Sequence, residues 1–221
     1  FATYSKIRIK TLKIIKHIFF GDSLTSCDNM DEADSWVSNL EYSINEKNHY
    51  YNYLAINKGI GGENTRQALE RIQDDVQNLC PEILSIQFGA NDSDCWVSNR
   101  GLPCVSAGSF YENLMEIIFR SKKFEVRKIF LHTNHKFLKT RLESNGLTHN
   151  DTLFSYNEII RKVALDSDSE LIDIGKALLN LNPESYCMPL PDGVHLSKDG
   201  SKEYFKVIYP HLKTYIDSIV S

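Results

Sequence analysis

The chain has 221 residues, of which 42% are hydrophobic and 24% are charged, and its formal net charge is −4. This size and composition are typical of a globular protein with one substantial core, so we expect a single domain spanning residues 1–221. The negative charge argues against a nucleic-acid partner, because nucleic-acid binding depends on clustered Lys and Arg. The sequence has no uninterrupted apolar run of ~20 residues, so no membrane span is predicted.

The first segment of the chain is basic. It carries Lys6, Arg8, Lys10, Lys13 and Lys16, which alternate with apolar residues. This alternation predicts either an extra edge strand or a short helix with a solvated charged face. We assign this segment no function.

Short apolar runs then alternate with helical periodicity along the whole chain. This order is typical of an α/β protein in which helices cover both faces of a parallel sheet. The five predicted strands are 14–20, 53–57, 83–88, 128–133 and 170–174.

Helices are predicted between the strands, where apolar residues recur every three to four positions. The clearest apolar stripes lie in 69–79, 110–118 and 156–163. The last helix is expected to begin after Ser197, a favourable N-cap, and Pro210 should kink or divide it. Two long connections, 93–107 and 135–150, are expected to form pocket walls.

The five cysteines form no C-x-x-C pair, and their number is odd, so no metal ribbon or complete disulfide framework is predicted. We expect reduced thiols, although Cys95 and Cys104 flank one connection and could pair in an exported protein. The chain begins at Phe1 rather than Met. A cytoplasmic location is favoured, and export stays open.

Each of the first three predicted strands runs into a polar segment that contains glycine. These segments are Gly21-Asp22-Ser23-Leu24, Asn57-Lys58-Gly59-Ile60-Gly61-Gly62-Glu63-Asn64 and Gly89-Ala90-Asn91-Asp92. Any one of them is explained by a simple turn, because Gly, Asp and Ser are turn formers. In a parallel sheet, however, all three emerge at the same edge, which is where α/β proteins bind ligands.

A serine nucleophile needs a histidine base and a carboxylate that orients the histidine. Ser23, His195 and Asp192 supply these groups, since a carboxylate three residues before a histidine can fold back onto its ring. Acyl transfer also needs hydrogen-bond donors for the oxyanion. The predicted donors are the Ser23 N–H, the Gly62 N–H and the Asn91 amide, and Gly59 is an alternative donor if the local register is shifted.

With these four blocks in place, the chain resembles the SGNH hydrolases, also called the GDSL esterase/lipase family. The family's Ser, Gly, Asn and His blocks match in order at Ser23, Gly62, Asn91 and Asp192 to His195. The second block departs slightly, because many members have Ser or Asn where Gly61 stands. The resemblance implies a flavodoxin-like three-layer α/β/α fold with a parallel sheet of about five strands, a Ser nucleophile, a His base with an Asp partner, and no metal or organic cofactor.

We therefore expect a serine esterase that acts on a small-molecule or carbohydrate-linked acyl ester through an acyl-serine intermediate. Short acyl groups are favoured, with acetyl on carbohydrate as one candidate, because no large amphipathic lid segment is present. The alternatives are an O-acyltransferase that uses the same site on a sugar acceptor and a binding module without activity. Asp22, Trp96 and His135 are candidates for lining the substrate pocket. The physiological substrate and the oligomeric state stay open.

Overall fold

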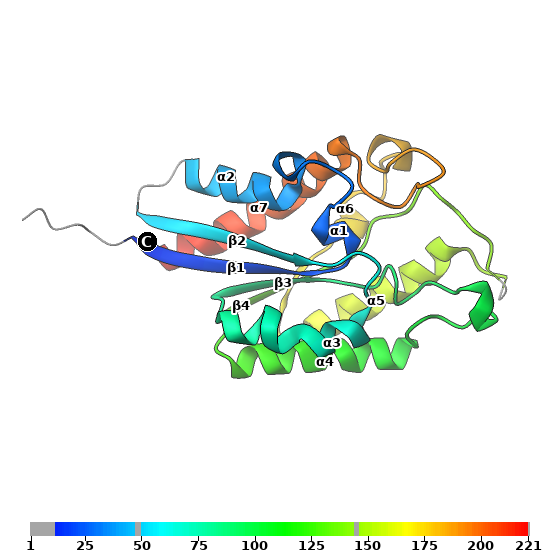
Figure 1. The fold of residues 1–221 in the computed structure, drawn as a ribbon, viewed down its shortest axis with the longest axis horizontal. Helices are drawn as coiled ribbons and strands as arrows, with labels where there is room; N and C mark the ends of the chain where they lie inside the picture. The colour runs from blue at the N-terminus through cyan, green and yellow to red at the C-terminus, as the bar shows by residue number, and fades with distance from the viewer. Residues whose placement is uncertain (1–11, 47–49, 144–145, 221) are drawn as a thin grey trace, which may run out of the picture.

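A computed structural model describes residues 12–46, 50–143 and 146–220 of the chain. These residues form a parallel five-stranded sheet in the order β2-β1-β3-β4-β5 (Figure 1). The strands are β1 (Lys13–Gly21), β2 (Tyr51–Gly59), β3 (Ile83–Gln87), β4 (Lys128–His132) and β5 (Glu170–Ile172). All five predicted strands are confirmed. The last is shorter than predicted, because Asp173 turns the chain into a helix by capping Lys176.

Helices cover both faces of the sheet, so the fold has the three α/β/α layers that the resemblance implied (Figure 1). One layer contains α2 (Trp36–Glu46) and α7 (Lys198–Val220), and the other contains α3 (Thr65–Asp75), α4 (Ala107–Lys123) and α5 (His149–Asp166). The short elements are α1 (Ser23–Ser26), α6 (Ile174–Ala177), η1 (Glu32–Asp34), η2 (Gln77–Leu79), η3 (Val97–Asn99) and η4 (Pro183–Ser185).

Strand β1 shows why both faces must be covered. Its side chains alternate between faces, so Ile15 and Phe19 join the core under α2 and α7, whereas Ile18 and Phe20 join the core over α3, α4 and α5. All four side chains are completely buried. A strand that is apolar on both sides has to lie in the interior of a covered sheet.

The described part of the basic N-terminal segment belongs to β1 itself. Lys13 forms an ion pair with Glu82 at 3.3 Å, and Lys16 donates to the Leu79 carbonyl at 3.1 Å. The sequence pattern predicts an edge strand or a short helix here. For the described part this prediction is wrong, because β1 lies between β2 and β3 in the sheet. The remainder of that prediction, 6–10, lies outside the described residues.

Helix α7 begins directly after Ser197, as predicted, but Pro210 does not divide it. The proline removes one backbone hydrogen bond. On both sides of it, however, α7 buries apolar and aromatic side chains against the sheet. These are Tyr204, Ile208, Leu212 and Ile216. Burial of side chains of this size stabilises a helix by more than one hydrogen bond contributes, so the helix continues.

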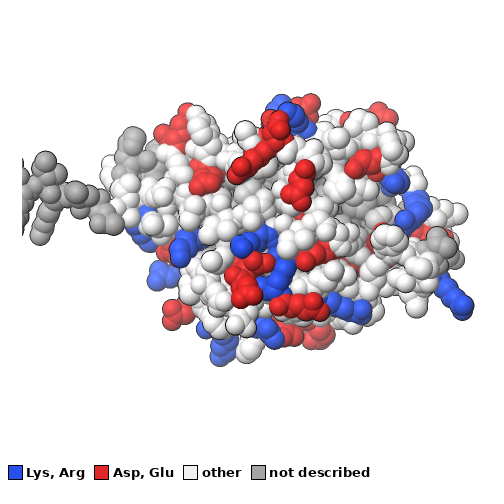
Figure 2. Space-filling model, in the orientation of Figure 1, with Lys and Arg blue, Asp and Glu red and all other residues white. Residues whose placement is uncertain are grey.

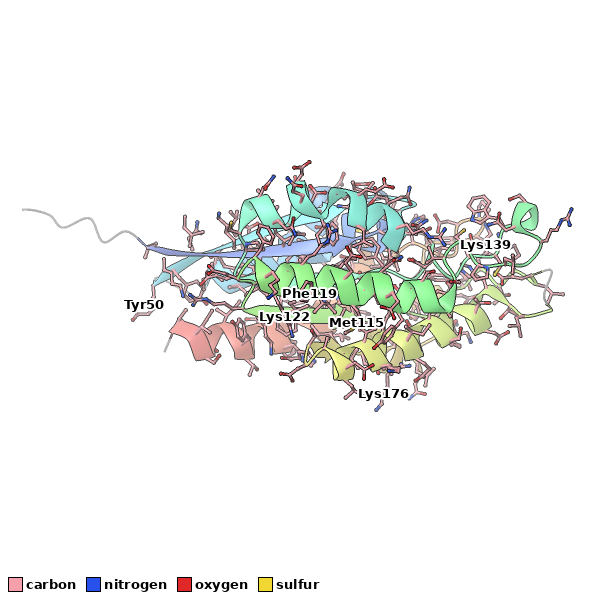
Figure 3. All side chains as sticks on the ribbon, turned by 90° about the horizontal axis from the view of Figure 1, so that it is seen from below. Tyr50, Met115, Phe119, Lys122, Lys139 and Lys176 are labelled. Carbon is pink, nitrogen blue, oxygen red and sulfur yellow. The ribbon has the colours of Figure 1, made fainter. Side chains whose placement is uncertain are left out.

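The long connections lie at the end of the molecule where the strands have their carboxyl ends. Figure 3 shows Lys139, from the connection that follows β4, near one end and Tyr50, just before β2, near the other. On the face drawn in Figure 2, acidic and basic side chains are interspersed. In the part of the chain that the structure describes, no helix is long and apolar enough to cross a bilayer. All five cysteines are free, so Cys95 and Cys104 do not pair.

Candidate active site

Ser23, His195 and Asp192 form a continuous hydrogen-bonded chain, although 172 residues separate the serine from the histidine. The His195 Nε2 lies 3.0 Å from the Ser23 Oγ, and the His195 Nδ1 lies 2.7 Å from the Asp192 Oδ2. A carboxylate can only accept, so Nδ1 carries the proton and Nε2 is left to accept the serine hydroxyl. This is the arrangement in which imidazole acts as a base toward serine.

The carboxylate of Asp192 is held in its charged form. Burial by itself would raise the pKa of Asp192, but the His195 ring and the N–H groups of His195 and Val194 together bring it below its usual value. Both N–H groups donate to the Asp192 Oδ1 at 2.9 Å. The Asp-x-x-His spacing therefore builds a turn in which the carboxylate binds its own following backbone and the ring at once.

Neighbouring segments hold this turn from two sides. The Lys139 N–H donates to the Gly193 carbonyl at 2.9 Å, and the Met188 N–H donates to the His195 carbonyl at 2.7 Å. His195 is thus fixed by main-chain bonds that do not depend on the Asp192 side chain.

Asp22 does not line the substrate pocket, contrary to the prediction. Its side chain is completely buried and caps α1, accepting from the Leu24 N–H at 2.9 Å, while its Oδ2 has no hydrogen-bond partner among the described residues. Burial raises the pKa of Asp22 to about 7 against the effect of the Leu24 bond, and nearby Asp92 adds to the increase. An N-cap side chain turns back over its own helix, which is why Asp22 points inward while Ser23 faces the pocket.

The predicted oxyanion donors lie beside Ser23. Gly62 and Asn91 line the same pocket as Ser23, and Gly62 has a φ of +78°, a conformation that favours glycine. The Asn91 Nδ2 donates to the Glu63 carbonyl at 2.9 Å and retains a second N–H. Gly59 is not available as the alternative donor, because its N–H already donates to the Asn57 Oδ1 at 2.9 Å.

The turn that carries Asn91 is anchored by Asp92. The Asp92 Oδ1 accepts from the Thr65 N–H at 3.0 Å and from the Thr65 hydroxyl at 2.5 Å, and its Oδ2 accepts from the Gly89 N–H at 3.2 Å. Burial raises the pKa of Asp92 to about 6. The turn after β3 is thereby joined to the first residue of α3.

A pocket of about 390 Å³ opens over Ser23. It is lined by Ser23, Gly62, Ala90, Asn91, Asp94, Trp96, Phe137, Lys139, Arg141, His149, Asp192, Val194 and His195. Trp96, which is 56% exposed, lies in the lining as predicted. The connections 93–107 and 135–150 supply six of these residues, so their predicted place as pocket walls is confirmed; a larger cavity of about 620 Å³ beside β2 contains none of the triad.

His135 does not reach the pocket, contrary to the prediction. It is completely buried, with its Nδ1 2.6 Å from the Tyr204 hydroxyl and its Nε2 3.0 Å from the Val194 carbonyl. Burial lowers the pKa of His135 to about 4. His135 thus supports the backbone next to His195 from inside the protein. His132, three residues earlier at the end of β4, is also fully buried.

Several pocket residues were not singled out in the sequence, namely Phe137, Lys139, Arg141 and His149. The only signal for them was their position in a long connection at the active edge of the sheet.

Asp94, Glu143 and His149 form a group whose ligand atoms lie within 4.8 Å of one another, close enough to hold a metal ion. Arg141, however, forms ion pairs with both carboxylates, and Glu143 accepts from the Cys95 N–H and the Thr152 hydroxyl. The carboxylates of Asp94 and Glu143 therefore share the Arg141 guanidinium as a cationic partner, and Glu143 also has two neutral donors.

A model of the GDSL-like Lipase/Acylhydrolase family matches residues 19–202. A lipoprotein of Bacillus subtilis, YqeF, is 32% identical over 71% of this chain and 69% of its own length. The isoamyl acetate-hydrolyzing esterase of Saccharomyces cerevisiae is 22% identical over 90% of this chain and 87% of its own.

Solved structures have the same architecture. The acetyl xylan esterase AlAXEase superposes with a TM-score of 0.73 at 26% identity, covering 89% of this chain and 99% of its own. A lipase/acylhydrolase from Enterococcus faecalis gives a TM-score of 0.73 at 21% identity, over 91% of this chain and 96% of its own. At 21% identity, the likeness to the Enterococcus faecalis protein is evidence of the fold alone.

Proposed function

Because this chain belongs to the GDSL-like lipase/acylhydrolase family and is a carboxylic ester hydrolase, we propose that it cleaves short-chain esters through an acyl-serine intermediate on Ser23. The observation that carries the proposal is the hydrogen-bonded chain from the Ser23 Oγ through His195 to Asp192. We also infer that residues 1–221 act as one domain, because all of the proposed catalytic groups lie at one edge of one sheet.

In the first half of the reaction the Ser23 Oγ attacks the acyl carbon, and its proton passes to the His195 Nε2 at 3.0 Å. The Asp192 carboxylate stabilises the imidazolium that results. The same Nε2 then gives its proton to the leaving alcohol as the C–O bond of the ester breaks.

In the second half, His195 removes a proton from water, which attacks the acyl carbon and releases the acid from Ser23. In both halves the carbonyl oxygen becomes negative, and the Ser23 N–H, the Gly62 N–H and the Asn91 Nδ2 are its proposed donors.

The lining of the pocket supports an acetyl group on carbohydrate as the substrate. Exposed Trp96 offers an apolar face against which a sugar ring can pack, and Asp94, Lys139 and Arg141 offer donors and acceptors for hydroxyl groups. The structural relative with 26% identity is itself named an acetyl xylan esterase. The charged side chains of Asp94, Lys139 and Arg141 in this lining disfavour a long alkyl chain, because burying charged groups against hydrocarbon is unfavourable.

The test compares p-nitrophenyl acetate, butyrate and octanoate with an acetylated xylo-oligosaccharide, using the wild type and Ser23→Ala. We expect acetate to be the best of the three p-nitrophenyl esters and Ser23→Ala to be inactive. Ser26→Ala, in the same helical turn, is the matched control and should keep its activity. An active Ser23→Ala variant would refute the mechanism, and formation of a new acetylated sugar rather than acetate would identify transfer instead of hydrolysis.

A further inference from the structure

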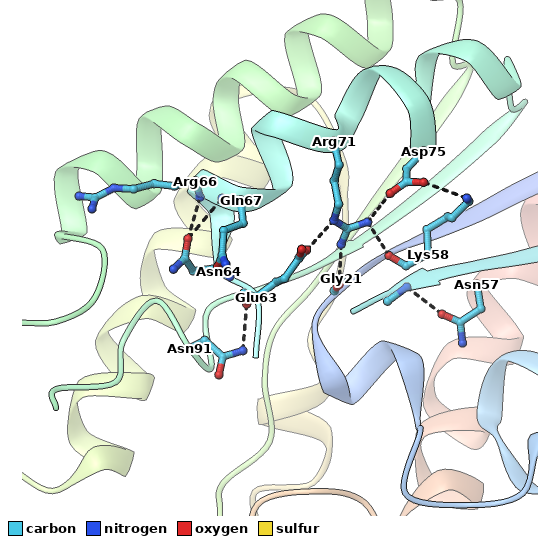
Figure 4. Close-up of polar contacts among 11 residues, drawn as sticks. Gly21, Asn57, Lys58, Glu63, Asn64, Arg66, Gln67, Arg71, Asp75 and Asn91 are labelled. Atoms are coloured by element: carbon cyan, nitrogen blue, oxygen red, sulfur yellow. Dashed lines mark hydrogen bonds and ion pairs between the residues drawn. The ribbon is translucent and has the colours of Figure 1, made fainter. Parts of the chain in front are cut away.

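Arg71, in the second turn of α3, is a mostly buried arginine whose polar groups are bound by several neighbouring segments. Its side chain is only 14% exposed, and its guanidinium makes four polar contacts (Figure 4). Nε lies 2.5 Å from the Glu63 carboxylate, and Nη1 lies 2.7 Å from the Asp75 carboxylate. The guanidinium carbon also lies over the Phe20 ring, 4.4 Å from its centroid.

The other two contacts of Arg71 are with main-chain carbonyl groups. Nη2 donates to the Gly21 carbonyl at 3.1 Å, two residues before Ser23, and Nη1 donates to the Lys58 carbonyl at 2.9 Å, at the end of β2. One side chain therefore binds the carboxyl ends of two neighbouring strands from the helix that covers them.

Through Glu63 the same guanidinium is connected to the remaining oxyanion donors. Glu63 directly follows Gly62, and its carbonyl accepts from the Asn91 Nδ2 at 2.9 Å (Figure 4). Arg71 thus contacts the segment of Ser23 directly, and it fixes the residue that positions both Gly62 and Asn91.

We propose that Arg71 is a positioning residue that sets the relative placement of the three oxyanion donors without touching the substrate. The proposal rests on the function proposed above. A planar guanidinium can bond two carbonyls and two carboxylates at fixed angles, which a lysine ammonium cannot do. Donors stabilise an oxyanion only when they are already aimed at its position, so a small displacement of these segments lowers the turnover rate.

Local charges make the arrangement specific to an arginine at this position. Arg71 and Lys58 together balance Glu63 and Asp75, with Lys58 lying 2.8 Å from Asp75. Without Arg71, the Glu63 carboxylate loses its ion-pair partner while only 15% exposed. It is then expected to turn toward water and to displace the Gly62–Glu63 backbone.

The experiment compares Arg71→Met and Arg71→Lys with Arg66→Met. Arg66 is on the same helix, but its side chain is exposed and extends away from this cluster (Figure 4). We expect Arg71→Met to lower kcat for p-nitrophenyl acetate by about 10- to 100-fold with KM changed by less than about twofold. Arg71→Lys should recover only part of the loss, and Arg66→Met should match the wild type.

Binding of phenylboronic acid separates positioning from general loss of structure. Its boron forms a tetrahedral adduct with the serine Oγ and places an oxygen where the oxyanion would lie. Its affinity should fall with kcat in Arg71→Met, whereas the affinity for acetate, a product without that geometry, should not. Combining Arg71→Met with Asn91→Ala should cost less than the product of the two single effects, because both act on the same donors.

A kcat within about twofold of the wild type in folded Arg71→Met, or equal losses in kcat and acetate affinity, would overturn the proposal. The side-chain amide signal of Asn91 in NMR spectra supplies a readout that needs no turnover, and it should shift in Arg71→Met but not in Arg66→Met. If Ser23→Ala keeps full activity, the proposed function fails. An unchanged Asn91 signal in Arg71→Met would separately refute the positioning.

Discussion

Replacing Tyr204 by Phe tests the buried support behind the His195 segment. The Val194 carbonyl can only accept, so the His135 Nε2 carries the ring proton, and the His135 Nδ1 must accept from the Tyr204 hydroxyl at 2.6 Å. Tyr204→Phe leaves this Nδ1 buried without a donor. An unsatisfied buried acceptor costs about 1–3 kcal/mol, which corresponds to a fall in Tm of roughly 2–4 °C per kcal/mol for a chain of this size.

Urea unfolding and Tm measurements on Tyr204→Phe and Tyr209→Phe provide the assay. Tyr209 lies on the same helix, and its ring stacks on Phe205; because no hydrogen bond of its hydroxyl is found among the described residues, Tyr209→Phe should change stability by less than about 0.5 kcal/mol. In a His135→Leu background, Tyr204→Phe should cost less than in the wild type, because the unpaired acceptor is gone. Equal costs for the two Tyr variants, or equal costs in both backgrounds, would refute the assigned ring proton.

Asp22→Asn should alter how stability depends on pH. The folded state raises the pKa of Asp22 to about 7, so ionisation of this buried carboxyl destabilises the fold progressively from about pH 4 to pH 7. In urea unfolding, Asp22→Asn should therefore be more stable than the wild type at pH 8 but not at pH 3. An equal difference in stability at both pH values would contradict this. Gly200→Ala should destabilise by about 1–3 kcal/mol, because a Cβ there would lie 1.9 Å from the Tyr186 carbonyl oxygen. Gly108 is also in the first turn of a helix, but a Cβ there would have no heavy atom of the described residues within 4 Å outside its chain neighbours and its own helix backbone. Gly108→Ala should instead stabilise by up to about 1 kcal/mol, and thermal melts that rank the two variants alike would show that the close contact at Gly200 is relieved at no cost.

The sheet and its active edge were predictable from the sequence because they depend on local patterns. Short apolar runs such as 14–20 predict covered strands, and their alternation with helical stripes predicts a parallel sheet whose strand ends share one edge. The polar segments with Ser23, Gly62 and Asn91 follow those ends directly, and the pair of Asp192 and His195 carries its geometry within four residues. The family resemblance then assigned these separate segments to one active site.

Tertiary structure alone decided which strand-end side chains face the pocket. His135 points inward because Tyr204, 69 residues away, and Val194, 59 residues away, provide its hydrogen bonds. Arg71 is one of many charged residues on a helical surface until folding brings Gly21, Lys58 and Glu63 around it. These orientations depend on partners distant in sequence, and no local periodicity encodes such contacts.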